Sequence, residues 1–176
     1  MKKEHDNILQ QMKKDLLAER YDCSLELANE KIPNDQLIVF LGNDSSDREK
    51  ILLVTAVEQV MQGEESKPSE PYHLVHFHVV FPFTIAPLAA SQTGSTILFI
   101  NRLLELPGFE MGEIEEKVSY RYALFMHGKQ VDKLLLFSII GNIMMTLDLF
   151  SGIIESVATG QKTFNDLLEE MLTLTK

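Results

Sequence analysis

Three histidines close together are the first residues of this sequence whose types and spacing could do chemistry. His73, His76 and His78 fall in a stretch of alternating residues that predicts one β-strand. Side chains alternate across a strand, so His76 and His78 share a face and could both ligate a metal ion. A closed zinc site needs four ligands, and no second ligand cluster with suitable spacing accompanies them. We therefore expect no metal and interpret the histidines as polar residues on a half-buried strand.

A second group of candidates consists of glutamates, which could supply paired carboxylates for general acid–base catalysis. The group comprises Glu110, Glu113, Glu115 and Glu116. Neither a nucleophile nor a histidine lies near them in the sequence, so a catalytic pair is not indicated. A charged strand that protects the edge of a sheet is the better interpretation.

Cys23 is the only cysteine, which excludes an intramolecular disulfide and favours a reducing compartment. It could act as a nucleophile with a distant histidine, but a small half-buried residue is the default interpretation. The run from Gly42 to Asp44 lacks the glycine spacing and the lysine of a phosphate-binding loop. The sequence therefore predicts neither an enzyme nor a cofactor.

The composition argues against some classes of partner. In 176 residues, acidic side chains outnumber basic ones by 26 to 16, which gives a formal net charge of −10. Non-specific nucleic-acid binding and adsorption to anionic membranes both rely on Lys and Arg, so we expect neither. We expect a neutral or basic partner instead. The first residues, 1–6, are charged rather than an apolar secretory core, which predicts a cytoplasmic protein.

The stretch 131–158 predicts one long helix that is apolar around most of its circumference. Its length would suit a membrane span, but Asn142 and Asp148 interrupt the apolar run. Ser138, Asn142 and Thr146 recur at four-residue steps, which predicts a narrow polar stripe. We expect a buried helix of a water-soluble protein, with surplus apolar surface for a deep core or another chain.

The remaining pattern predicts a single α+β domain, residues 1–176, with one antiparallel sheet and covering helices. Residues 21–30 could form a short edge strand or a loop, and 62–71 should be an exposed loop. The expected elements are an N-terminal helix within 1–20 (4–20), strands 36–42, 49–60 and 72–82, helix 88–106, strands 109–116 and 118–126, helix 131–158, and a helical tail 161–176 with a helix at 164–172.

Several runs of residues carry a family resemblance. They are the segments 101–110 (NRLLELPGFE), 118–122 (VSYRY), 139–150 (IIGNIMMTLDLF) and 154–160 (IESVATG). With them the chain resembles the YbjN-like proteins, which share their architecture with type III secretion chaperones. The resemblance covers roughly 88–160 and is a signature of the fold rather than of an active site.

The resemblance implies the order helix, three strands, helix, two strands, helix, a homodimer and no enzymatic activity. It places the dimer contact on helix 88–106 or strand 118–126. Secretion chaperones of this type bind an extended segment of an exported protein. The short extra C-terminal helix departs from the pattern.

Two functions remain open at this point. The first is a homodimeric protein- or peptide-binding module that resembles a type III secretion chaperone. The second is a small-molecule-binding or sensory regulatory domain of the YbjN-like type, in which the long helix roofs a pocket. For the first, an extended peptide could add to the sheet and seat alternate side chains in apolar pockets. The predicted contact residues are Val39, Leu41, Leu74, His76, His78 and Val80.

The strand 72–81 has two faces, and we expect the face with Val75, Phe77, Val79 and Phe81 to belong to the core. The other face carries Leu74 and Val80 but also two histidines. A fully solvent-exposed face would not be expected to carry two aliphatic side chains, and a fully buried face would not be expected to carry two histidines. The alternative is that a helix simply covers it.

Overall fold

The computed structural model describes residues 8–59, 71–106, 108–112 and 114–174 of the chain. The start of the expected first helix (4–7), most of the expected loop (62–70) and Pro107 lie outside the described residues. The elements are, in chain order, α1 (Ile8–Ala18), β1 (Cys23–Glu26), β2 (Gln36–Asn43), β3 (Glu49–Gln59), β4 (Tyr72–Thr84), a 3-10 turn η1 (Pro87–Ala89), α2 (Ala90–Leu103), β5 (Phe109–Gly112), β6 (Lys117–His127), α3 (Lys133–Ala158) and α4 (Phe164–Leu174).

The strands form one six-stranded antiparallel sheet in the order β1-β2-β3-β4-β6-β5. The strands β1 to β4 follow one another both in the sequence and in the sheet, and β6 lies between β4 and β5. The predicted α+β class with a single antiparallel sheet is therefore confirmed.

Three details of the expected order are corrected. Four strands, not three, precede α2 in the described part of the chain, because residues 23–26, which could have been an edge strand or a loop, pair with β2 as an edge strand. The expected strand 109–116 ends at Gly112, just before the turn in which Glu116 adopts a positive φ of 51°. The expected helix 88–106 begins as a 3-10 turn and ends at Leu103, because Leu104 is extended.

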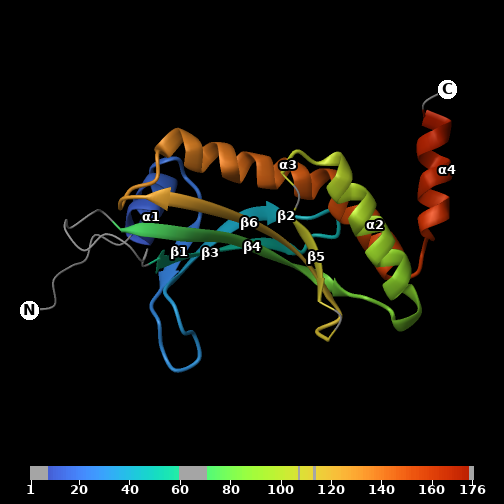
Figure 1. The fold of residues 1–176 in the computed structure, drawn as a ribbon, viewed down its shortest axis with the longest axis horizontal. Coiled ribbons are helices and arrows are strands. Elements are labelled where there is room, and N and C mark those ends of the chain that lie inside the picture. The colour runs from blue at the N-terminus through green and yellow to red at the C-terminus, as the bar shows by residue number, and fades with distance from the viewer. Residues whose placement is uncertain (1–7, 60–70, 107, 113, 175–176) are drawn as a thin grey trace, which may run out of the picture.

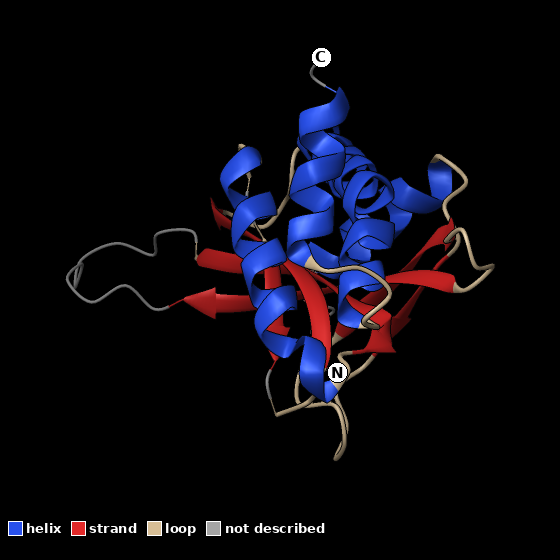
Figure 2. Ribbon diagram, turned by 90° about the vertical axis from the view of Figure 1, so that its right-hand side faces the viewer, coloured by secondary structure: helices blue, strands red, loops and turns tan. Residues whose placement is uncertain are grey.

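The core lies between one face of the sheet and the helices α1 and α3 (Figures 1 and 2). Buried residues alternate along the strands, as in Leu37, Val39 and Leu41 of β2. The predicted core face of β4 is confirmed, because Val75, Phe77, Val79 and Phe81 are all buried. From α1, Leu9, Met12 and Leu16 join the same cluster. The helix α2 packs against α3 and β5 at the far end of the sheet and adds Ile97 and Ile100 to the cluster (Figure 1).

The helix α3 has 26 residues and begins after Asp132, whose side chain accepts a hydrogen bond from the backbone N–H of Leu135. Such a cap satisfies one of the free N–H groups at a helix start. The predicted polar stripe is not continuous: Ser138 is exposed, Asn142 is half-buried and Thr146 is buried in the core. Among the described residues, α3 is the one helix long and apolar enough to cross a membrane.

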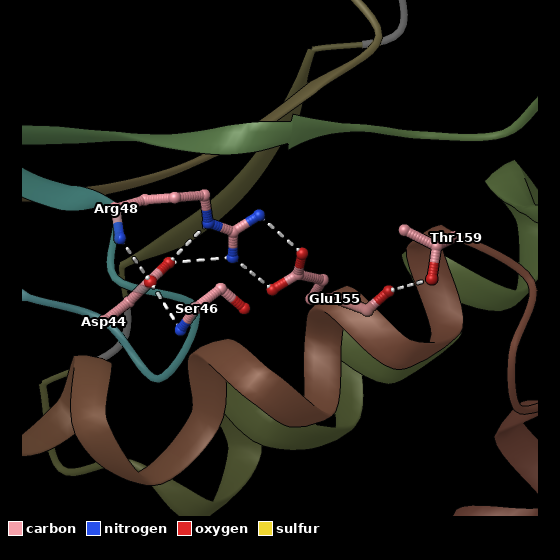
Figure 3. A network of polar contacts seen from close by, with 5 residues as sticks. All are labelled: Asp44, Ser46, Arg48, Glu155 and Thr159. Atoms are coloured by element: carbon pink, nitrogen blue, oxygen red, sulfur yellow. Dashed lines mark hydrogen bonds and ion pairs between the residues drawn. The ribbon is translucent and has the colours of Figure 1, made fainter.

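Ion pairs tie the β2–β3 region to α3 (Figure 3). The Arg48 guanidinium donates two hydrogen bonds to the Glu155 carboxylate, at 2.7 and 2.6 Å, and a third to Asp44 at 2.7 Å. Lys50 and Asp148 form a second pair between β3 and α3 at 2.6 Å. The turn between β2 and β3 is therefore fixed against the C-terminal half of α3.

Candidate functional site

The sheet has a second face, which we call the open face, on the side away from α1 and α3 (Figure 1). Strand register places its members in rows that cross the sheet, such as Ile38, Leu53, His78 and Arg121. A second row joins Val57, Leu74 and Phe125. The apolar members of the open face are Ile38, Phe40, Ile51, Leu53, Val57, Leu74, Val80 and Phe125.

The open face remains in contact with water although it is largely apolar. Phe125 is 54% exposed and Val80 is 47% exposed, while the aliphatic residues nearer the centre of the sheet are half-buried. Soluble proteins rarely leave a contiguous apolar area of this kind uncovered unless it serves as an interaction site. The open face is therefore the candidate functional site.

Four of the six predicted contact residues lie on the open face, and two do not. Leu74, His76 and His78 are half-buried there and Val80 is exposed. The prediction for Val39 and Leu41 is corrected, because both point into the core and are 0% and 4% exposed. Ile38 and Phe40, the alternate residues of the same strand, take their place on the open face.

The two histidines of the open face lie in an apolar setting. Burial lowers the pKa of His78, an effect that nearby Arg121 and His76 reinforce and that Glu110 opposes. His78 is therefore largely uncharged at neutral pH and compatible with an apolar ligand. His73 points to the other face. No three His, Cys, Asp or Glu side chains could hold a metal ion together in the part of the chain that is described.

A cavity of about 260 Å³ lies at one corner of the open face, where β1, β2 and β3 meet. Its apolar wall is formed by Ile38, Phe40 and Ile51, and the carboxylates of Asp22 and Glu49 also line it. The lining is completed by Cys23 and Ser24. An apolar wall with two carboxylates suits a long side chain that has an aliphatic stem and a positive end.

Cys23 shows no sign of activation. Burial raises the pKa of its thiol, with a smaller raising effect of Asp22 and a lowering effect of Lys13. The Sγ atom lies 3.8 Å from the Lys13 carbonyl oxygen, to which it donates a weak hydrogen bond. Because the thiolate is the nucleophilic form, a raised pKa does not favour nucleophilic catalysis.

The edge of the sheet next to the open face has backbone groups that could pair with an added strand. The strand β5 is an edge strand, as the charge pattern predicted, and its Glu110 pairs with Arg121 of β6. It pairs only with residues 117–120 of β6. Residues 122–127 of β6 therefore have β4 on one side and, among the described strands, no partner on the other. An unpaired edge of this kind can accept an added strand.

The open face was partly missed from the sequence because both faces of β2 are apolar. The run from Leu37 to Leu41 contains no polar residue that would mark the outward side. Phe125 was not predicted either, although it lies directly opposite Leu74 in the register. Neither any protein-family model nor any curated protein matches this chain.

Proposed function

We propose that this protein is a non-enzymatic, homodimeric module that binds an extended segment of another protein on the open face, in the cytoplasm. The observation that carries the proposal is the apolar surface centred on Leu74, Val80 and Phe125, which none of the described helices covers. A wide and shallow apolar face suits a peptide or protein surface better than a small molecule, which binds in a concave pocket.

The charge of the molecule supports a neutral or basic client. The chain has a formal net charge of −10, and the corner cavity contributes two carboxylates beside an apolar wall. Lys or Arg of a client can lay its stem along Phe40 and bring its charge to Asp22 or Glu49. Such attraction between opposite charges weakens with added salt.

The resemblance to type III secretion chaperones supports the same class of function. With β1 set aside, α1, three strands, α2, two strands and α3 follow the order that the resemblance implies. Those chaperones bind extended segments of other proteins, as proposed here. Fold likeness alone does not establish function, so the proposal depends on the open face rather than on the resemblance.

Self-association is supported by the outer side of α3, which we call the outer seam. It consists of Leu134, Ser138, Gly141, Met145, Leu149, Gly152 and Ser156, which recur every three or four residues. Leu134 is 79% exposed, and Met145 and Leu149 are also more than half exposed. The seam contains no charged residue, although the protein is acidic.

The order of side-chain sizes along the outer seam favours a second copy as its partner. Between Ser138 and Ser156 the seam reads small, small, large from either end, with Ser138 and Gly141 before Met145, and Ser156 and Gly152 before Leu149, while Leu134 lies beyond this symmetric part. A twofold axis near residue 147 would place each large residue of one copy beside the large residues of its partner. A twofold interface needs a self-complementary surface of this kind. Exposed Leu98 and Leu103 on α2 mark the surface that the resemblance would favour instead.

The binding proposal is tested with the double variant Leu74→Asp, Val80→Asp. The probe is a fluorescently labelled synthetic peptide in which apolar residues alternate with Lys, and the same peptide with Glu for Lys is the charge control. We expect the Lys peptide to bind, the Glu peptide not to bind, and the double variant to lose at least about tenfold in affinity. Fluorescence anisotropy measures the binding, and circular dichroism checks the fold.

The variant Leu98→Asp is the matched control, because Leu98 is 69% exposed on α2 and does not belong to the sheet. It should bind the Lys peptide as the wild type does. Equal affinity of the double variant and the wild type would contradict the proposal. Loss of fold in the double variant would show that Leu74 and Val80 are structural and would remove them from the site.

The self-association proposal is tested by light scattering on the full chain. The wild type should have the mass of a dimer at micromolar concentration, and Met145→Glu, Leu149→Glu should be a monomer, because two copies would then bury like charges. The variant Leu98→Asp should remain a dimer. A monomeric wild type, or a dimer that only Leu98→Asp dissociates, would contradict the assignment to the outer seam.

A further inference from the structure

A cavity of about 430 Å³ lies between α2, α3 and α4, away from the open face. This volume is within the usual range of small-molecule sites. The helix α4 stands beside α2 and points away from the sheet (Figures 1 and 2). The lining residues are Thr96, Phe99, Ile100 and Leu103 of α2, Phe150, Gly152, Ile153 and Ser156 of α3, and Lys162, Leu167 and Glu170 at α4.

The polar groups of the lining already have partners within the chain. The Thr96 hydroxyl donates to the Gln92 carbonyl oxygen at 2.9 Å, and the Ser156 hydroxyl donates to the Ile153 carbonyl oxygen at 2.7 Å. The Lys162 ammonium donates to both carboxylate oxygens of Glu170, at 2.7 and 2.8 Å. The charges of the lining therefore cancel, and the rest of the wall is mainly aromatic and aliphatic.

The outer wall of the cavity is held in place by the first turn of α4. The backbone N–H of Phe164 donates to Gln92 Oε1 at 2.9 Å, and the Phe164 ring meets Phe99 edge to face at 5.8 Å between centroids. Thr163 and Asp166 hydrogen-bond to each other's backbone N–H groups in the manner of a capping box. The start of α4 is thus fixed on α2, and a ligand could lie between its first two turns and α3.

We propose that the cavity between α2, α3 and α4 binds an uncharged, apolar small molecule. An apolar ligand would cover Phe99, Leu103 and Ile153 and remove their side chains from water. A charged ligand would bring its charge into a mainly apolar site whose one cation is already neutralised by Glu170, which is costly. The chemistry of the lining therefore selects against both acids and amines.

This proposal is independent of peptide binding, because the two sites share no lining residue. It also differs from self-association, although Gly152 and Ser156 belong both to the outer seam and to the cavity. Gly141 belongs to the outer seam but not to the cavity. A Cβ added at either glycine would meet no atom within 4 Å. The two glycines are therefore a matched pair that separates the cavity from the seam.

The test uses two dyes that share an aromatic skeleton, neutral N-phenyl-1-naphthylamine and anionic 1-anilinonaphthalene-8-sulfonate. Both fluoresce more strongly in an apolar site, and titration gives their affinities. We expect the wild type to bind the neutral dye saturably with one site per chain, and the anionic dye at least about tenfold more weakly. Gly152→Phe should abolish binding of the neutral dye, and Gly141→Phe should leave it unchanged. The smaller replacement Gly152→Leu should weaken binding as well.

The double variant Leu74→Asp, Val80→Asp is the second control and should bind the neutral dye as the wild type does. Absence of saturable binding, equal affinity in Gly152→Phe, or loss of binding in the Leu74 and Val80 variant would each overturn the proposal. A dye affinity that falls as the protein concentration rises would assign the cavity to a second copy of the chain, and this result would overturn the proposal too.

Discussion

Arg48 joins two parts of the chain that lie 107 residues apart, because its guanidinium binds the Glu155 carboxylate with both terminal nitrogens. Planar, two-point pairs of this kind are among the stronger charged contacts in proteins. Asp44 completes the group and accepts backbone hydrogen bonds from Ser46 and Arg48 as well. Burial alone would raise the pKa of Asp44, but the hydrogen bonds and the charge of Arg48 outweigh this effect and lower it.

The first prediction concerns Asp44→Asn. Because the pKa of Asp44 is lower in the folded state, its carboxylate stabilises the fold fully above about pH 4, the ordinary range of Asp, and loses this effect as the pH falls through the folded-state pKa. At neutral pH the variant should lower the free energy of unfolding by about 1 kcal/mol. Urea denaturation at several pH values should show the difference shrinking in acid.

Asp47→Asn serves as the control for this prediction. Asp47 is exposed in the same turn. It accepts a hydrogen bond from Asn43, whereas Asp44 accepts hydrogen bonds from Arg48. Its replacement should leave the free energy of unfolding nearly unchanged. A difference in the free energy of unfolding between the wild type and Asp44→Asn that is the same at all pH values would contradict the prediction.

The turn between α2 and β5 shows, at the scale of an element, how two residues fix the geometry of a tight connection. The Asn101 side chain donates to the Phe109 carbonyl oxygen at 2.9 Å and accepts from the N–H groups of Gly108 and Phe109. Gly108 lies so close to β6 that an added Cβ would be 2.3 Å from the Arg121 carbonyl oxygen. Asn and Gly are therefore needed here for the geometry of the turn.

The second prediction follows from this close contact. Gly108→Ala should lower the free energy of unfolding by about 1–3 kcal/mol, because the backbone of β6 has to move to admit the methyl group. Gly94→Ala is the control, since its Cβ would meet only a Met111 methyl carbon at an ordinary 3.7 Å. An alanine within a helix should be neutral or stabilising by up to about 1 kcal/mol. Chemical denaturation of the two variants compares them directly, and equal stability would contradict the prediction.

The elements with a clear period were predictable from the sequence, and the side of the sheet that stays open was predictable only in part. Alternation of histidine with aliphatic residues identified both faces of β4. In β2 every residue from Leu37 to Leu41 is apolar, so the strand register alone decides that Val39 is buried and Phe40 faces out. The sequence did not decide whether β1 is a strand or a loop, because the alternation of Leu25 and Leu27 with polar residues is too short to separate the two. Leu27 lies beyond the end of β1 and is 63% exposed.

At the scale of the whole molecule, α3 is apolar enough to raise the question of a membrane. Its inner side, however, is built into the core, where Leu136, Ile140, Ile143 and Ile154 are at most 1% exposed. Insertion into a bilayer would remove these residues from the sheet and would carry Asp148 and Glu155 away from Lys50 and Arg48. The sequence could indicate the apolar surplus but not how it is divided between the core and the outer seam.

The third prediction is that the full chain remains in the supernatant after lysis without detergent and high-speed centrifugation. The reason is that α3 is one wall of the core, and the ion pairs at its edge require water-accessible charges. Recovery of the protein solely in the membrane fraction, with release only by detergent, would contradict this prediction.

The position of β6 between β4 and β5 affects how the protein folds during its synthesis on the ribosome. The hairpins from β1 to β4 can form as soon as those strands emerge, since each pairs with its sequence neighbour. The second edge of β4, the longest of the described strands, stays unpaired until β6 emerges, and the part of the core face that α1 does not cover stays exposed until α3 emerges later still. The nascent chain therefore carries an incomplete sheet whose core face is covered by α1 alone, and pulse-labelling by hydrogen exchange should find β2 and β3, which already have a strand on each side, protected before β4 and β6.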